Sequence, residues 1–222
     1  SGVYAALHGH PGICSESEWE PIRRDIALAK ETGCAYHVCH ISTKESVALI
    51  RQAKAEGLDV TCETAPHYLT LCEDDLQEDG RFKMNPPLRA REDREALIAG
   101  LIDGTVECIA TDHAPHSLDE KSRGLEKSAF GIVGLETAFP ILYTELVEKG
   151  LVDLDTILAL LTDRPRARFS IPLGTDFSVW DLGAEYTIDP GDFASMGRAT
   201  PFAGRRVRGR CLATWYNAKR VY

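Results

Sequence analysis

Three short apolar segments of this chain each end close to a side chain that can bind a metal ion. Asp112 follows the run ECIAT, His40 follows HVC, and His67 follows VTCETAP. One carboxylate and two imidazoles are donors that suit Zn²⁺ or a similar divalent ion. A carboxylate beside such an ion can also accept a proton from bound water, whose pKa the metal lowers to about 7. The three residues together predict a hydrolytic metal site in which Asp112 binds the metal and accepts a proton from its water.

Each of these residues taken alone also has a simple structural interpretation. An aspartate at the end of a strand can cap the next turn, and a lone histidine is more often packed or solvated than metal-bound. His37 lies three positions before His40, so on a strand the two side chains face opposite sides. We therefore assign His40, and not His37, as the ligand, and the prediction depends on the whole set.

Two further segments have features of a substrate-binding site. In KMNPPLR, two prolines fix the backbone, so Asn85 can present an amide donor and acceptor to a ring amide. The same pattern also fits a rigid surface turn. In FGIVGLET, Gly131 allows a ligand to approach the backbone closely, and Gly134 opens a helix. That segment is equally consistent with a plain loop-to-helix junction.

The elements that must position these residues alternate along the chain. Apolar periodicity predicts helices over residues 17–33, 44–56, 91–103, 135–148 and 154–161, and strands over 35–41, 58–63, 82–85 and 106–111. Ser17 and Thr43 are the expected caps of the first two helices. Alternation of this kind predicts an α/β fold with a parallel sheet, and polar residues at strand ends are typical of (β/α)8 barrels.

The pattern of alternating helices and strands ends at about Ser170. Glycine and proline separate short runs at 177–182, 186–188, 205–208 and 212–216, which predicts a small β module. We therefore divide the chain into a barrel portion, residues 1–170, and a β-sandwich portion, residues 171–222. The barrel portion contains about four strand–helix units rather than eight, which leaves open sheet edges. We expect another part of the protein, or a partner, to supply the rest.

Composition excludes several classes of partner. The net charge is −9, which disfavours nucleic acid, and the one basic cluster, at 205–210, alternates as a solvated strand face would. No apolar run is long enough to cross a membrane. The seven cysteines form no CxxC pair. Cys39, Cys62, Cys108 and Cys211 lie in apolar runs and are expected to be reduced and buried, in a cytoplasmic protein.

The ordered set of motifs resembles the dihydroorotase family of cyclic amidohydrolases. The strings that carry the resemblance are HVCHISTKES, VTCETAPHYL, FKMNPPLRAREDREALIAGLIDGTVECIATDHAPHSLDEK, FGIVGLET and GRATPFAGRRVRG. It implies strands five to eight of a TIM-type barrel and one or two zinc ions. It implies that His40, His67 and Asp112 bind metal, and that Asp112 moves the proton during reversible hydrolysis of dihydroorotate. It also implies that Asn85, His116 and the backbone near Gly131 contact the substrate.

The chain departs from the family pattern in several places. The family's first-strand His-x-His pair, the following arginine and a bridging carboxylated lysine or aspartate have no counterpart here. The only His-x-His, His8-Gly9-His10, precedes Pro11 and is predicted to lie in a loop. We therefore expect the 222-residue chain alone to bind metal poorly and to be weakly active or inactive. Tyr68, often histidine in dihydroorotases, is tyrosine in some hydantoinase- and allantoinase-like enzymes.

These departures leave two alternatives open. The substrate ring could be allantoin, a hydantoin or a dihydropyrimidine, or the chain could belong to a non-catalytic dihydroorotase-like scaffold. The resemblance implies a small-molecule substrate and a homodimer in the full-length form, and it allows aspartate transcarbamoylase as a partner.

Overall fold

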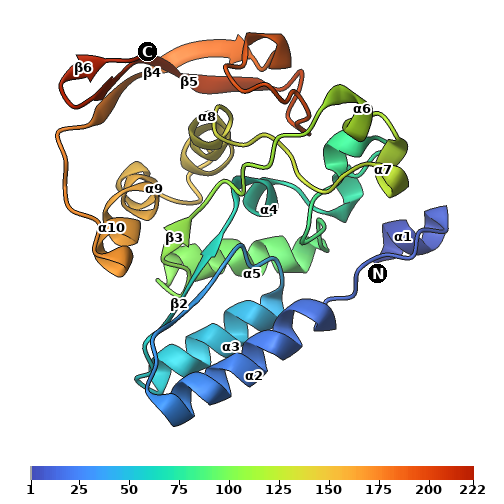
Figure 1. The fold of residues 1–222 in the computed structure, drawn as a ribbon, viewed down its shortest axis with the longest axis vertical. Helices are drawn as coiled ribbons and strands as arrows, with labels where there is room; N and C mark the ends of the chain where they lie inside the picture. Colours follow the sequence, from blue (N-terminus) through green and yellow to red (C-terminus); the bar gives the residue numbers. More distant parts are fainter. Residues whose placement is uncertain (1) are drawn as a thin grey trace.

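The computed structural model describes residues 2–222, and Ser1 lies outside them. Two sheets organise the chain (Figure 1). The first is parallel, in the order β1 (Tyr36–Val38), β2 (Val60–Thr64) and β3 (Cys108–Ile109). The second is antiparallel, in the order β4 (Phe177–Thr187), β5 (Arg206–Tyr216) and β6 (Lys219–Arg220). The predicted α/β class with a separate β module is confirmed in this coarse form.

Helices connect the parallel strands, as the periodicity predicts. α2 (Glu16–Thr32) precedes β1, α3 (Lys44–Ala55) joins β1 to β2, and α5 (Arg91–Ile102) precedes β3. Thr43 caps α3 by accepting a hydrogen bond from the backbone N–H of Ser46. The cap predicted at Ser17 is wrong, because α2 begins after Ser15 and the Ser17 hydroxyl donates to the Cys14 carbonyl instead.

The strand predicted over 82–85 does not form. Gly80–Phe82 is a 3₁₀ turn (η2), and Lys83 N–H donates back to the Gly80 carbonyl. The carbonyl of Lys83 accepts hydrogen bonds from Gly131 N–H and from the side chain of Lys121. Because a turn and a neighbouring loop use the backbone groups of Lys83, these groups are not available to a sheet ladder.

The helix predicted over 135–148 is shorter and irregular. α8 (Ala138–Leu142) continues into one π turn, η3 (Tyr143–Val147). Pro140 lies inside α8 and cannot donate a backbone hydrogen bond to the preceding turn, which accounts for the weakened start. α9 (Leu154–Leu161) forms as predicted, and α10 (Asp163–Phe169) follows it.

Shorter elements fill the remaining connections. They are α1 (Val3–His8), α4 (Pro66–Thr70), η1 (Glu73–Asp75), α6 (Leu118–Lys121), α7 (Gly124–Lys127) and η4 (Pro190–Asp192). α1 takes in His8, so the loop predicted for the His-x-His motif begins only at Gly9. The four short C-terminal runs merge into the two long, bulged strands β4 and β5. This sheet packs on α8 through Trp180 and Phe139, whose ring centroids are 4.4 Å apart.

Residues 2–222 do not close a barrel. β1 and β3 are the two edges of the parallel sheet, and the next parallel contact is a single bridge between His113 and Ile132. Over the same residues, no helix has the length and hydropathy that a membrane crossing requires.

The expected burial of the strand cysteines is only partly correct. Cys62 and Cys108 are buried, and all seven cysteines are free thiols. Cys39 is exposed and Cys211 is half-buried. Cys39 lies one residue past the end of the edge strand β1, and therefore no second strand covers it.

Candidate metal and substrate site

The three predicted metal ligands follow the same edge of the parallel sheet. Backbone pairing continues past the ends of the strands, from Ile41 N–H to the Glu63 carbonyl and from Ala110 N–H to the Thr64 carbonyl, each 2.9 Å long. His40, His67 and Asp112 therefore leave neighbouring strands at their carboxyl ends. This is the edge at which parallel α/β folds place their reactive side chains.

The two histidines each present an unpaired nitrogen inside the molecule. Nδ1 of His40 and Nε2 of His67 are buried, and neither has a hydrogen-bond partner among the described residues. Burial, with a smaller contribution from His40, lowers the pKa of His67 to about 3, so its imidazole is neutral at pH 7. A neutral imidazole with a free, buried lone pair is the form that binds a metal ion.

The carboxyl group of Asp112 interacts electrostatically with His40. Burial raises the pKa of its carboxyl group, His40 opposes that shift, and Glu63 adds to it. No described residue donates a hydrogen bond to the Asp112 carboxylate, so its oxygens remain available. The backbone of His40 (φ 36°) and of Asp112 (φ 48°) is left-handed, a conformation that residues other than glycine adopt rarely.

Residues 2–222 do not contain a preassembled metal centre. No three histidine, cysteine, aspartate or glutamate side chains among them are grouped so that they could hold an ion. The donor types and the two unpaired nitrogens fit a divalent cation, but the set is incomplete. His37 takes no part, because its ring contacts Thr61 and Glu63, at 2.7 Å and 3.3 Å.

The predicted substrate residue Asn85 is tied to the His67 segment. Asn85 is exposed, and its side chain makes no hydrogen bond to any described residue. The adjacent Pro86 carbonyl accepts a 2.6 Å hydrogen bond from the buried hydroxyl of Tyr68. The ring of Tyr68 in turn lies edge-on to His67, with centroids 4.1 Å apart. The turn that carries Asn85 is thereby held against a predicted ligand.

His116 and Gly131, two of the predicted substrate residues, lie close together. His116 Nε2 is 2.7 Å from the Phe130 carbonyl oxygen. A Cβ atom on Gly131 would lie 2.6 Å from Cβ of Ala114 and 3.1 Å from Nε2 of His116. The N–H and the carbonyl of Gly131 already bond to protein groups, so its main contribution here is the space that its missing side chain leaves.

Sequence reasoning missed two residues that support this edge. The Glu18 carboxylate accepts five hydrogen bonds, from the backbone and hydroxyl groups of Ser42, the same two groups of Thr43, and the hydroxyl of Ser46. Arg89 donates from Nε to the Ser42 hydroxyl and from Nη1 to the Ile13 carbonyl. Both residues therefore brace the turn that directly follows His40.

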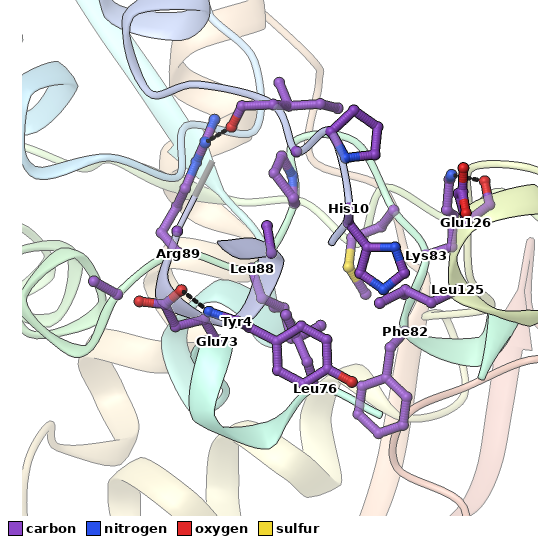
Figure 2. A pocket seen from close by; sticks show the side chains of 18 of the residues that line it. Tyr4, His10, Glu73, Leu76, Phe82, Lys83, Leu88, Arg89, Leu125 and Glu126 are labelled. Atoms are coloured by element: carbon purple, nitrogen blue, oxygen red, sulfur yellow. Dashed lines mark hydrogen bonds between the residues drawn. The ribbon is translucent and has the colours of Figure 1, made fainter. Parts of the chain in front are cut away.

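A cavity of about 250 Å³ lies beside the predicted site rather than at it. Figure 2 shows Tyr4 and His10, from the N-terminal segment, among the lining side chains together with Phe82, Lys83 and Leu88. None of His40, His67 and Asp112 lines this cavity. Residues on both sides of Asn85, at 82–84 and 87–90, line the cavity, and it does not mark the metal ligands.

Comparisons with known proteins agree with the motifs. A family profile described as "Dihydro-orotase-like" matches residues 2–46. A dihydroorotase of Brevibacillus brevis is 54% identical over 100% of this chain and 54% of that protein. A dihydroorotase of Shouchella clausii is 53% identical over the same shares. The chain spans about half the length of the curated relatives it matches.

Solved structures of other proteins share this fold over most of the chain. An L-hydantoinase (dihydropyrimidinase) from Arthrobacter aurescens superposes with a TM-score of 0.83 at 31% identity, covering 91% of this chain and 48% of that one. An inactive dihydroorotase-like domain of a Chaetomium thermophilum CAD-like multifunctional protein gives 0.69 at 25% identity, covering 88% and 53%.

Proposed function

This chain is homologous over its full length to dihydroorotases, and we propose that it forms part of an enzyme that reversibly hydrolyses dihydroorotate to N-carbamoyl-L-aspartate. The similarity of the whole chain, at about half identity, to curated dihydroorotases carries this proposal. The parallel sheet would be strands five to eight of a TIM-type barrel. The enzyme would be a cytoplasmic homodimer, with aspartate transcarbamoylase as a partner to be tested.

His40, His67 and Asp112 would hold the metal, through Nδ1, Nε2 and a carboxylate oxygen. Bound zinc would supply Lewis acidity at the ring carbonyl and a water of lowered pKa. Two buried nitrogens without partners support this assignment. An unpaired buried polar group costs about 1–3 kcal/mol, and a bound metal ion would remove that cost. Further ligands would come from outside this chain.

Asp112 would move the proton of the reaction. Its carboxylate accepts no hydrogen bond from the described residues, so it can take a proton from water and pass it to the leaving ring nitrogen. Burial raises the pKa of the Asp112 carboxyl group, which makes it a better base than an exposed aspartate. Asn85 and His116 would bind the ring and its carboxylate, beside the space left by Gly131.

The test is a comparison of substrates with the polypeptide that carries this chain. The zinc-loaded protein should turn over dihydroorotate in preference to allantoin, hydantoin and dihydrouracil. Asp112→Asn should abolish turnover, while His37→Asn, which alters a histidine outside the ligand set, should leave it within a few-fold. Activity on allantoin or hydantoin with none on dihydroorotate would overturn the proposal.

Two other functions, hydrolysis of a different ring and a scaffold role, each have a specific observation in their favour. The same assay distinguishes them from the proposed function. The likeness to an L-hydantoinase favours a different ring, in line with tyrosine at position 68. The likeness to an inactive dihydroorotase-like domain favours a scaffold. A scaffold would show neither turnover of any ring nor stoichiometric zinc.

A further inference from the structure

A nearly buried lysine binds three backbone carbonyl groups in the loop region of the candidate site. Lys121, the last residue of α6, is 6% exposed. Its Nζ donates to the carbonyl oxygens of Lys83 at 3.0 Å, Ala129 at 2.7 Å and Gly131 at 2.7 Å. An ammonium group has three N–H donors, and here each has an acceptor.

The three carbonyl groups belong to the segments that carry the predicted substrate contacts. Lys83 lies two residues before Asn85, and Gly131 is itself one of the predicted residues. Residues 116–131, which we call the 116–131 loop, run from His116 through α6 and α7 to Gly131. Lys121 lies inside this loop and bonds both to its far end and to the Lys83 segment outside it.

Other contacts show that the loop and the Lys83 segment form one unit. Gly131 N–H donates to the Lys83 carbonyl at 3.0 Å, and Ala129 N–H donates to the Glu120 carbonyl at 3.0 Å. The side chain of Lys83 donates to the Glu126 carbonyl at 2.6 Å, and these two residues lie side by side in Figure 2. Lys121 is the only one of these donors that reaches three carbonyl groups.

A surface role does not account for Lys121. No carboxylate of the described residues forms an ion pair with it, although Asp79 and Lys83 are the charged groups whose fields reach it. Burying an ammonium group without a counter-ion is unfavourable unless its hydrogen bonds are satisfied. Three carbonyl groups meet that condition, which makes the side chain a rigid connection between segments.

We propose that Lys121 is a positioning residue that fixes Asn85, His116 and the Gly131 backbone relative to one another for substrate binding. Its side chain bonds to none of His40, His67 and Asp112, and it reaches Gly131 only through the backbone carbonyl. The role in substrate binding rests on the proposed function above. The connection between the segments rests on the hydrogen bonds alone.

The test compares Lys121→Met, which keeps the side-chain length and removes the donors, with Lys121→Arg, which keeps the charge. Lys127→Met, on the exposed face of α7, is the matched control. All are made in the polypeptide that carries this chain. Measurements are KM and kcat for dihydroorotate, zinc per chain, and hydrogen exchange at the Gly131 amide.

For Lys121→Met we expect KM to rise about ten-fold or more, with a smaller fall in kcat and unchanged zinc. Exchange at Gly131 should become faster, while exchange in β1 and β2 stays as in the wild type. KM and Gly131 exchange of Lys121→Arg should lie between those of the wild type and of Lys121→Met. If Lys121→Met does not fold, Lys121→Arg tests the positioning role instead. Lys127→Met should match the wild type.

The outcomes separate this inference from the proposed function. The positioning role would be overturned if, in Lys121→Met, both the exchange at the Gly131 amide and KM matched the wild type. Equal losses of kcat and of bound zinc in a folded variant would also overturn it. A wild type that does not act on dihydroorotate, combined with faster Gly131 exchange in the variant, would reject the proposed function and keep the structural connection.

Discussion

The guanidinium Nη2 of Arg89 lies 3.8 Å from the carboxylate Oε2 of Glu18, and the two side chains are only 7% and 10% exposed. This pair links the first turn of α2 to the segment that follows the two prolines beside Asn85. Both partners also bond to the turn after His40, through Ser42. One buried ion pair thus connects a predicted metal ligand with a predicted substrate segment.

Glu18→Ala should be strongly destabilising. It leaves five donors without their acceptor and the Arg89 guanidinium without its nearby carboxylate, and breaking a buried charged network costs about 3–5 kcal/mol. Glu20→Ala removes a carboxylate from the same helix that only approaches Arg23, at 3.8 Å on the surface, and should cost less than about 1 kcal/mol. Urea denaturation of both variants measures the difference, and similar losses would contradict the role of Glu18.

Removing either unpaired imidazole should weaken zinc binding. His40→Ala and His67→Ala each delete one proposed donor and should lower zinc affinity at least about ten-fold in the polypeptide that carries this chain. His37→Ala is the matched control, because His37 already bonds to Thr61 and Glu63. Competition with a chelator gives the affinities, and a loss in His37→Ala as large as in the other two would refute the ligand assignment.

Gly131→Ala should be more harmful than the same change at another glycine of positive φ. Gly131 has φ 130°, and its added methyl group would lie 2.6 Å from Cβ of Ala114. Gly104 has φ 78° with open space around it, so Gly104→Ala should cost only about 1–2 kcal/mol. The first variant should lose more, roughly 2–4 kcal/mol, because backbone strain and overpacking add. Thermal unfolding compares the two variants. Equal decreases in their melting temperatures would show that the loop near Ala114 moves to accommodate the added methyl group.

The stability contribution of Lys121 should depend on pH in the alkaline range. Burial, followed by the charge of Lys83, lowers the pKa of Lys121 from 10.5 to about 8. Between these pH values the unfolded chain holds a proton that the native chain releases, so this contribution rises with pH. The unfolding free energy of the wild type, minus that of Lys121→Met, should increase from pH 8 to pH 10. A decrease over that range would show that the fold favours the protonated amine.

The sequence predicts the strand-end positions well because a general rule covers them. An apolar run followed by a polar residue can be recognised in the amino-acid sequence, and parallel strands bring their carboxyl ends to one edge of the sheet. His40, His67 and Asp112 follow that rule. Their exact roles remain predictions, since residues 2–222 do not form a complete metal group.

The supporting residues could not be predicted because their partners are distant in sequence. Glu18 and Arg89 meet only after α2, β1 and α3 have packed, and nothing in the local sequence around either residue indicates burial. Lys121 belongs to the charged run LDEK, which reads as a solvated surface turn. The strand expected over 82–85 failed for the same reason, since a neighbouring loop takes the backbone of Lys83.

Left-handed backbone at His40 and Asp112 costs stability at two positions that the proposed function assigns to metal ligands. Glycine adopts such dihedral angles at lower cost than histidine or aspartate. A search for thermostable variants that ignored turnover would therefore tend to replace both residues and discard the proposed ligands. Stabilisation of this protein is better sought in exposed segments, with positions 40 and 112 held fixed.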